Sequence, residues 1–259
     1  MSFNFNEYKE GTSPLHKLDA RIKIICSFAA IVGVVALSHW QMPLLVLFIC
    51  LALVVYSRAP MKTFLKRLLY PTYIIIFVTV IQPFTYGSTA IAAVPWLSLP
   101  IYQEGISFGI LVFTRALSAV AILNLLILVT PMERVLDSLR WFKIPTAITD
   151  TMMLMFRYIS LLSEESARIR KAQESRLGYS KSVSIIKKLS NFGTLAGMLL
   201  ARSFDRALKV GDAMVSRGYT GAPNLFAYST TKLSRKDSLI GVLAILAVIG
   251  LLLIDLFII

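Results

Sequence analysis

Acidic residues are scarce in this chain, and two long stretches carry no charge of either sign. The 259 residues include 14 Asp and Glu against 27 Lys and Arg, which gives a formal net charge of +13. No charged residue occurs from Ile24 to Ser57 or from Leu68 to Gln103. With 56% hydrophobic and only 16% charged residues, the chain is too apolar for one or two soluble domains. A lipid bilayer is therefore the expected solvent.

Side chains that carry out catalysis or bind metals are also few. The two cysteines, Cys26 and Cys50, lie inside apolar runs, which is typical of small buried hydrophobes. The two histidines, His16 and His39, lie in the N-terminal tail and in a predicted outside loop. The sequence also lacks a Gly-x-x-x-x-Gly-Lys-Ser/Thr loop for ATP. We expect no catalytic site, no metal site and no cofactor.

The apolar runs predict an all-α integral membrane protein with about five transmembrane helices. A span needs roughly 20 apolar residues, so the uncharged run from Ile24 to Ser57 suits two short helices broken near Pro43. A further helix pair within 141–163 is left open, although Pro145 and Arg157 interrupt that stretch and favour an interfacial helix. The predicted spans lie near 22–38, 43–57, 70–86, 105–129 and 238–258.

The positions of Lys and Arg predict how the chain is oriented. Four lie in the N-terminal arm up to Lys23, four lie at 58–67 and eighteen lie at 134–236, whereas the loops at 39–42 and 87–104 hold none. Cytoplasmic loops retain positive charge, so we expect a cytoplasmic N-terminus and an outside C-terminus. The expected domains are a membrane domain at 1–135, cytoplasmic helices at 136–237 and a C-terminal transmembrane helix at 238–259.

Two long amphipathic helices are expected between about Ala147 and Gly221, joined near residues 178–190. Gly178 and Gly218 each follow a helical run, where a left-handed cap residue is expected. The second helix has an apolar face from Leu200 to Val215 and a positive stripe on the opposite side. Both a solvated face and a docking face would account for that stripe. Its positions are Arg202, Arg206, Lys209, Ala213 and Arg217.

Two motifs at the ends of these helices resemble those of energy-coupling factor (ECF) transmembrane proteins, the T components of ECF transporters. They are Lys171-Ala172-Gln173-Glu174-Ser175-Arg176 and Asp212-Ala213-Met214-Val215-Ser216-Arg217-Gly218-Tyr219. In that family each motif is a small residue, an arginine and a small residue at the end of a coupling helix. Leu177 departs from the pattern, because glycine or another small residue is usual there.

The resemblance extends over nearly the whole chain. It includes Thr12-Ser13-Pro14-Leu15-His16-Lys17-Leu18-Asp19, Phe156-Arg157-Tyr158 and Arg202-Ser203-Phe204-Asp205-Arg206-Ala207. The N-terminal pattern and the stretch from Ala213 to Gly221 are most similar to CbiQ, the T component of cobalt transporters. Cobalt is therefore the cargo that the resemblance implies, with nickel or a vitamin as the alternative.

The resemblance also implies a role and a set of partners. The chain would transmit motion in a prokaryotic cell membrane between two ABC-type ATPase subunits, which hydrolyse ATP, and a separate membrane subunit that captures the substrate. A buried guanidinium needs an acidic or carbonyl partner in the ATPase groove. The ATPase-docking residues implied by the motifs are Ser175, Arg176, Ala213, Met214, Ser216, Arg217 and Gly218.

Three other functions fit the residues less well. Glu164-Glu165 followed by Arg168 is similar to the paired glutamates of intramembrane CAAX-type proteases, but the arginine is one residue too close. A self-sufficient carrier would need a polar pathway, and the spans offer little beyond Arg115, Asn124 and Gln82; for Arg115 we expect an ion pair or a helix-end carbonyl contact. A nucleic-acid-binding protein would also carry excess positive charge. Positive cytoplasmic loops beside the lipid bilayer, together with an acidic protein partner, already explain that charge, so we expect no nucleic-acid partner.

Overall fold

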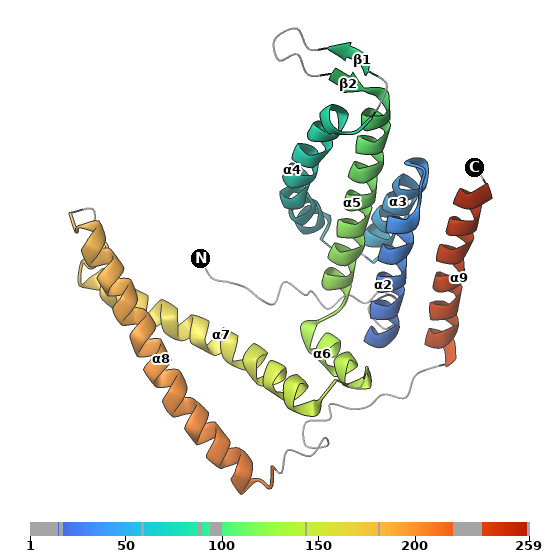
Figure 1. Cartoon of the computed structure of the whole chain (residues 1–259). Helices are drawn as coiled ribbons and strands as arrows, with labels where there is room; N and C mark the ends of the chain where they lie inside the picture. Colours follow the sequence, from blue (N-terminus) through green and yellow to red (C-terminus); the bar gives the residue numbers. More distant parts are fainter. Residues whose placement is uncertain are drawn as a thin grey trace. The chain divides into compact units, whose positions relative to one another are not determined.

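The computed structural model describes residues 15, 18–57, 60–87, 90–93, 100–142, 144–180, 182–219 and 235–257. Helices account for most of these residues, so the all-α membrane fold is confirmed (Figure 1). The elements follow in the order α2 (Ala20–Ala36), α3 (Gln41–Tyr56), α4 (Met61–Thr85), β1 (Ala90–Ala93), β2 (Pro100–Tyr102), α5 (Gln103–Val129), α6 (Met132–Trp141), α7 (Thr146–Ser175), α8 (Ile185–Ser216) and α9 (Arg235–Phe257).

The described residues form two compact units. The membrane unit holds those of Glu7–Val135 and Thr231–Ile259, and the hairpin unit holds those of Leu136–Thr230. The predicted domains are a membrane domain at 1–135, a cytoplasmic segment at 136–237 and a transmembrane helix at 238–259, and this division remains a proposal.

Three helices among the described residues are long and apolar enough to cross a membrane. They are Met61–Thr85, Gln103–Val129 and Asp237–Phe257. Helices α2 and α3 have 17 and 16 residues. At 1.5 Å per residue they reach only about 25 Å, less than the roughly 30 Å of a bilayer core. The count of five spans therefore remains a prediction.

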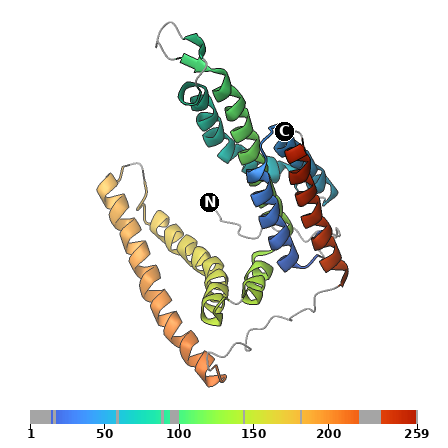
Figure 2. The ribbon, with the colours of Figure 1, turned by 45° about the vertical axis from the view of Figure 1, so that its right-hand side comes forward.

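Helix α5 is the centre of the membrane unit, and α2, α3 and α4 all pack against it (Figure 2). All four helices contribute side chains to one shared core, and the members of that core are at most 5% exposed. They are Val34, Cys50, Val54, Phe64, Ala121, Ile122 and Leu128. Helix α9 packs on α2.

Glycine allows the closest approach between α4 and α5. A Cβ on Gly105 would lie 2.6 Å from the carbonyl oxygens of Gln82 and Tyr86, and one on Gly109 would lie 3.2 Å from the carbonyl oxygen of Thr79. Backbone atoms cannot swing aside as a flexible side chain can. The two helices are therefore fixed at a distance that only glycine permits.

Two expectations about the region from 58 to 104 are wrong. Helix α4 begins at Met61 and not near residue 70, because Lys62, Lys66 and Arg67 continue the helix beyond the apolar run. The apolar run indicates only the part of a helix that lies inside the bilayer, whereas the helix itself can continue into the polar residues beside it. The expected loop at 87–104 contains an antiparallel pair, β1 and β2, in which Ala93 lies opposite Pro100.

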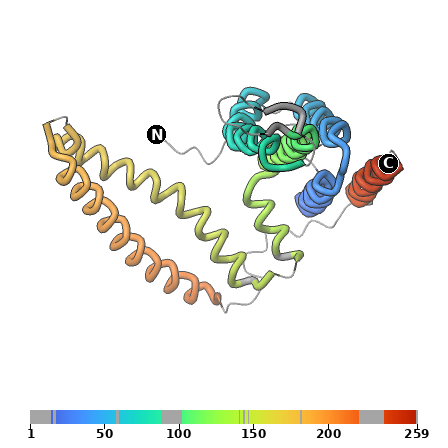
Figure 3. Tube along the Cα trace, turned by 45° about the horizontal axis from the view of Figure 1, so that its top comes forward, coloured from blue at the N-terminus to red at the C-terminus, as the bar shows by residue number. Residues whose placement is uncertain are grey.

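In the hairpin unit, α7 and α8 run antiparallel and side by side (Figure 3). The apolar stretch from Ile144 to Leu162 forms the first half of α7 rather than a further helix pair. The joint between the helices is shorter than the expected 178–190, because α8 begins at Ile185 with Ser184 as its N-cap. Helix α8 has 32 residues, which corresponds to a length of about 48 Å.

Candidate functional site

Arg176 is the C-cap residue of α7, with φ −88° and ψ 15°. Two main-chain hydrogen bonds close the helix behind it. Leu177 N donates to Glu174 O at 2.9 Å, and Gly178 N donates to Gln173 O at 2.9 Å. This pair of bonds, one spanning four residues and the other six, is the Schellman motif, which satisfies carbonyls that the helix end leaves free.

Arg217 occupies the same position at the end of α8, with φ −92° and ψ 12°. Gly218 N donates to Val215 O and Tyr219 N donates to Met214 O, both at 2.9 Å. Gly218 takes the left-handed conformation at φ 79°. The two arginine motifs therefore share one backbone geometry, which places each guanidinium-bearing residue where its helix stops.

The expected left-handed cap is correct for Gly218 and wrong for Gly178. At the first end the left-handed residue is Leu177, with φ 60°. The Schellman bonds fix the position: the residue directly after the C-cap must turn left-handed, and the C-cap here is Arg176. Gly178 instead supplies the second N–H of the motif.

The predicted docking residues gather at the two opposite ends of the hairpin, because Arg176 precedes the joint and Arg217 ends α8. Neither arginine has an ion-pair partner within the part of the chain that the structure describes. Met214 is half-buried, and the other predicted docking residues are open to solvent. The exposed positions are Ser175, Arg176, Ala213, Ser216, Arg217 and Gly218.

Glu165 joins the two helices near the middle of the hairpin. Arg202 Nη1 donates to Glu165 Oε1 at 2.8 Å, and Arg206 Nη2 lies 3.5 Å from Glu165 Oε2. The hydrogen bond from Arg202 holds the pKa of Glu165 below its usual range. Part of the positive stripe thus pairs with α7, and the glutamate that resembled a protease residue forms an interhelical ion pair.

Polar side chains also hold the hairpin at its ends. At the joint, Gln173 Nε2 donates to Asn191 O at 2.9 Å, and Asn191 Nδ2 donates to Gly178 O at 2.8 Å. At the other end, Tyr219 OH donates to Asp150 Oδ2 at 3.3 Å. Sequence reasoning missed these contacts, because residues 13 to 69 positions apart give no local signal.

The apolar face of α8 is open along its length. Leu195 is buried at 8% exposure, whereas the side chains of the open face are 56 to 84% exposed. A Cβ placed on Gly193, Gly197 or Gly211 would meet no atom within 4 Å. The exposed side chains are Ile185, Ile186, Leu189, Phe192, Leu200, Phe204, Leu208 and Val215.

Arg115 and Asp255 hold the turn between α2 and α3 from two sides. Arg115 Nη2 donates to the carbonyl of Leu37, which confirms the expected helix-end contact. Asp255 accepts from Ser38 N at 2.6 Å and from His39 N at 3.2 Å. The charge in the middle of α5 thus stabilises the turn between α2 and α3.

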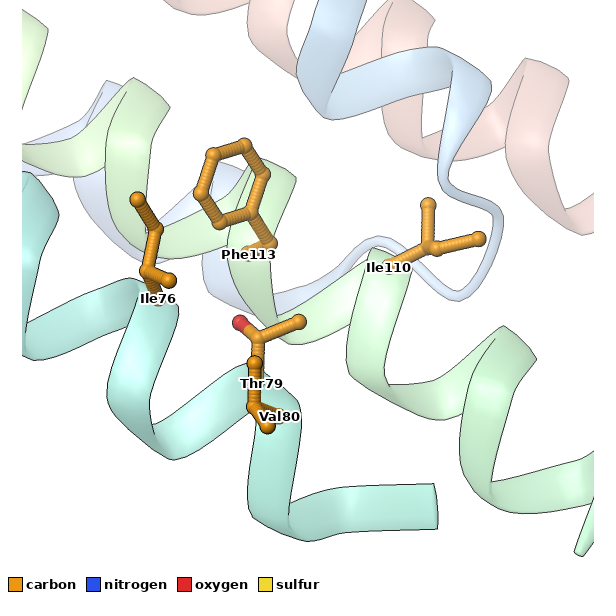
Figure 4. Close-up of a pocket in the computed structure, with 5 residues that line it drawn as sticks. All are labelled: Ile76, Thr79, Val80, Ile110 and Phe113. Atoms are coloured by element: carbon orange, nitrogen blue, oxygen red, sulfur yellow. The ribbon is translucent and has the colours of Figure 1, made fainter. Parts of the chain in front are cut away.

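One hollow of the membrane unit is apolar. It lies between α4 and α5, has a volume of about 260 Å³ and is lined by four apolar side chains and one threonine, Thr79, whose hydroxyl donates to Ile75 O (Figure 4). Among the described residues, no three His, Cys, Asp or Glu side chains come together as metal ligands. The lining residues are Ile76, Thr79, Val80, Ile110 and Phe113.

Comparison with known proteins identifies the family. The model of the cobalt transport protein family, CbiQ, matches residues 11–228. The chain belongs to this family. The match covers both arginine motifs and the sequence of all helices from α2 to α8.

Curated relatives align over most of their own length. The energy-coupling factor transporter transmembrane protein EcfT of Exiguobacterium sibiricum is 31% identical over 254 residues, 94% of this chain and 95% of the relative. EcfT of Ruminiclostridium cellulolyticum is 30% identical over 243 residues, 90% of each chain. An uncharacterised protein of Methanocaldococcus jannaschii, MJ1089, is 31% identical over 229 residues, 85% of this chain and 82% of the relative. The resemblance to ECF transmembrane components is thus confirmed.

Proposed function

We propose that this chain is the coupling subunit of an ECF-type importer. It transmits the motion of two ABC-type ATPase subunits to a separate membrane subunit that captures the substrate. The chain itself performs no chemistry, and ATP is hydrolysed on the partner subunits. It is a multi-pass protein of the prokaryotic cell membrane with its N-terminus in the cytoplasm.

The observation that carries this proposal is the matched geometry of the two arginine ends. Arg176 and Arg217 cap separate helices with the same hydrogen-bond pattern, and about 48 Å of α8 separates the ends on which they lie. One small groove cannot accept both ends, so two separate ATPase subunits fit the arrangement. Each guanidinium can form charge-assisted hydrogen bonds with an acidic groove.

The open face of α8 supports the second half of the proposal. Eight hydrophobic side chains of α8 are more than half exposed, which is costly for a helix that stays in water. A membrane subunit with its own apolar surface would cover them, and the bare glycines would let its helices approach closely. The same face would then move when the ATPases draw the helix ends together.

Copurification tests the proposal. The full-length tagged chain is expected to retain its ABC-type ATPase subunits, whereas Arg176→Ala and Arg217→Ala should each weaken the complex, because truncating one member of a buried charged pair costs about 2 to 5 kcal/mol. Arg168→Ala and Lys209→Ala are matched controls, since they remove exposed positive charges between the ends. Unchanged ATPase recovery and uptake in both end variants would rule out docking through these arginines.

Cobalt is the proposed cargo, because the family model is that of cobalt transport proteins. Nickel or a vitamin is the alternative, since the curated ECF relatives carry no substrate in their names. Uptake of radioactive Co²⁺ and Ni²⁺ by cells with and without the gene distinguishes these cargoes. Loss of Co²⁺ uptake alone supports cobalt, and unchanged uptake of both ions points to an organic cargo.

A further inference from the structure

The two arginine ends differ at one residue of an otherwise shared backbone motif. Leu177 follows Arg176 at φ 60°, and Gly218 follows Arg217 at φ 79°. Glycine adopts this left-handed conformation freely, whereas an L-residue with a Cβ is strained in it. A branched apolar side chain is therefore held at a position for which glycine is the favoured residue.

Nothing in the cap itself requires a leucine. The bonds that close the helix use the main-chain N–H groups of Leu177 and Gly178, which glycine would supply equally well. The Leu177 side chain is 70% exposed, so packing within the chain does not compensate for the strain. Strained residues that local packing does not explain are concentrated at binding sites.

Two further apolar side chains are exposed at the joint end of the hairpin. Helix α8 starts at the same end of the hairpin with Ile185 and Ile186, which are 84% and 81% exposed. At the other end Arg217 is followed by Gly218, around whose Cβ position no atom lies within 4 Å. The two ends therefore differ directly after the arginine, where one carries an exposed apolar side chain and the other carries only glycine backbone.

We propose that Leu177 is a specificity-determining residue that inserts into an apolar recess of one ATPase groove. This inference rests on the proposed function. The groove that receives Arg176 must contain a pocket for a branched side chain, whereas the groove that receives Arg217 can close on the backbone of Gly218. The shared cap geometry of the two arginines implies the same class of partner at both ends, which favours an ATPase subunit over the bilayer for Leu177.

Three substitutions at this position separate the apolar contact from the backbone conformation. Leu177→Gly and Leu177→Asn both tolerate the left-handed conformation and remove the apolar side chain, whereas Leu177→Met keeps it. The dissociation constant of the full-length chain in lipid nanodiscs is measured against each purified ABC-type ATPase subunit of the same organism. We expect about tenfold weaker binding or more for the Gly and Asn variants and nearly unchanged binding for Met.

Thermal unfolding of the same samples distinguishes lost contact from lost folding. Leu177→Gly should leave the unfolding temperature unchanged or raise it, because it relieves the strained φ. Docking should thus weaken without any loss of stability. A photo-cross-linking residue placed at position 177 should attach to an ATPase subunit, and one placed at 218 serves as the comparison.

Two results would overturn the inference while leaving the proposed function intact. The first is that Leu177→Gly and Leu177→Asn bind the ATPase with wild-type affinity although Arg176→Ala is clearly defective. The second is that position 177 cross-links to lipid. If the wild-type chain binds no ATPase subunit, the proposed function fails and this inference fails with it.

Discussion

Asp255 is expected to stabilise the membrane unit more than any other single carboxylate that the structure describes in it. The residue is 4% exposed near the end of α9 and accepts three hydrogen bonds, from Ser38 N at 2.6 Å, His39 N at 3.2 Å and His39 Nδ1 at 3.0 Å. It thereby fastens α9 to a turn more than 200 positions away in the sequence.

Asp255→Ala removes all three acceptor contacts and leaves two backbone N–H groups without their partner. Hydrogen bonds to a charged group contribute about 1.5 to 3 kcal/mol each, and contacts that share one carboxylate do not add fully, so we expect a loss of about 3 kcal/mol. For a chain of this size the unfolding temperature should fall by about 6 to 12 °C. Asp255→Asn keeps one acceptor oxygen and should lose about half as much.

Thiol reactivity during heating in detergent measures this effect. Cys50 is 4% exposed in the core of the membrane unit, so a thiol-reactive dye reports its opening once Cys26 is replaced by alanine. Leu256→Ala is the matched control, because its side chain is 67% exposed one residue further along α9. An Asp255→Ala variant that unfolds within about 2 °C of its parent would refute the assigned role of the carboxylate.

The remaining predictions concern helix contacts and caps. Gly105→Ala should destabilise the membrane unit by about 1 to 3 kcal/mol in the same thermal assay, because its Cβ would meet two carbonyl oxygens at 2.6 Å, whereas Gly250→Ala, with nothing within 4 Å, should not. Gly218→Ala should lower the stability of the end of α8 by about 1 kcal/mol. Leu177→Gly should raise the stability of the end of α7 by about the same amount. Hydrogen exchange at the two helix ends measures both changes. The pKa of Glu165 is lowered, so its ion pair stabilises the hairpin at neutral pH, and this contribution declines as the pH falls below the usual glutamate pKa of about 4.3. Glu165→Gln should therefore weaken the acid-side loss of helicity seen by circular dichroism.

Composition and periodicity predict the helices well because both depend on residues that are close in sequence. The apolar runs locate α2, α3, α5 and α9 to within a few residues. The same signal misplaces the start of α4 by nine residues, since a helix can continue through Lys62, Lys66 and Arg67 after it leaves the apolar layer. Hydropathy therefore predicts where a membrane helix is buried better than where it begins.

The cap at the first arginine shows a different limit. Sequence alone favours Gly178 as the left-handed residue, because glycine adopts positive φ without strain. The conformation is decided instead by which carbonyls the last turn leaves free, and those place the left-handed residue directly after Arg176. A preference of about 1 kcal/mol for glycine is smaller than the combined value of two cap hydrogen bonds.

Contacts between residues that are far apart in the sequence could not be predicted from the sequence alone. The positive stripe of α8 suggested a face for solvent or for a partner, yet Arg202 and Arg206 face Glu165, which lies 37 positions before the first of them. A lone glutamate gives no indication of which helix it will meet. A family motif marks Arg176 and Arg217 in the sequence, whereas no motif marks the side chains that align the two helices.

The distribution of polar and apolar groups on α8 connects its fold to its role. In an isolated hairpin, the apolar face would be expected to pack inward and the charged face outward. Here the charged residues Arg202 and Arg206 hold α8 to α7, and the apolar face remains open. Partly exposed ion pairs contribute modestly to stability, so these pairs and the polar contacts at the two ends hold the hairpin without an apolar core. In the function that we propose, partners that cover the apolar face and bind both arginine ends would add stability, and they could change the helix–helix geometry at small cost.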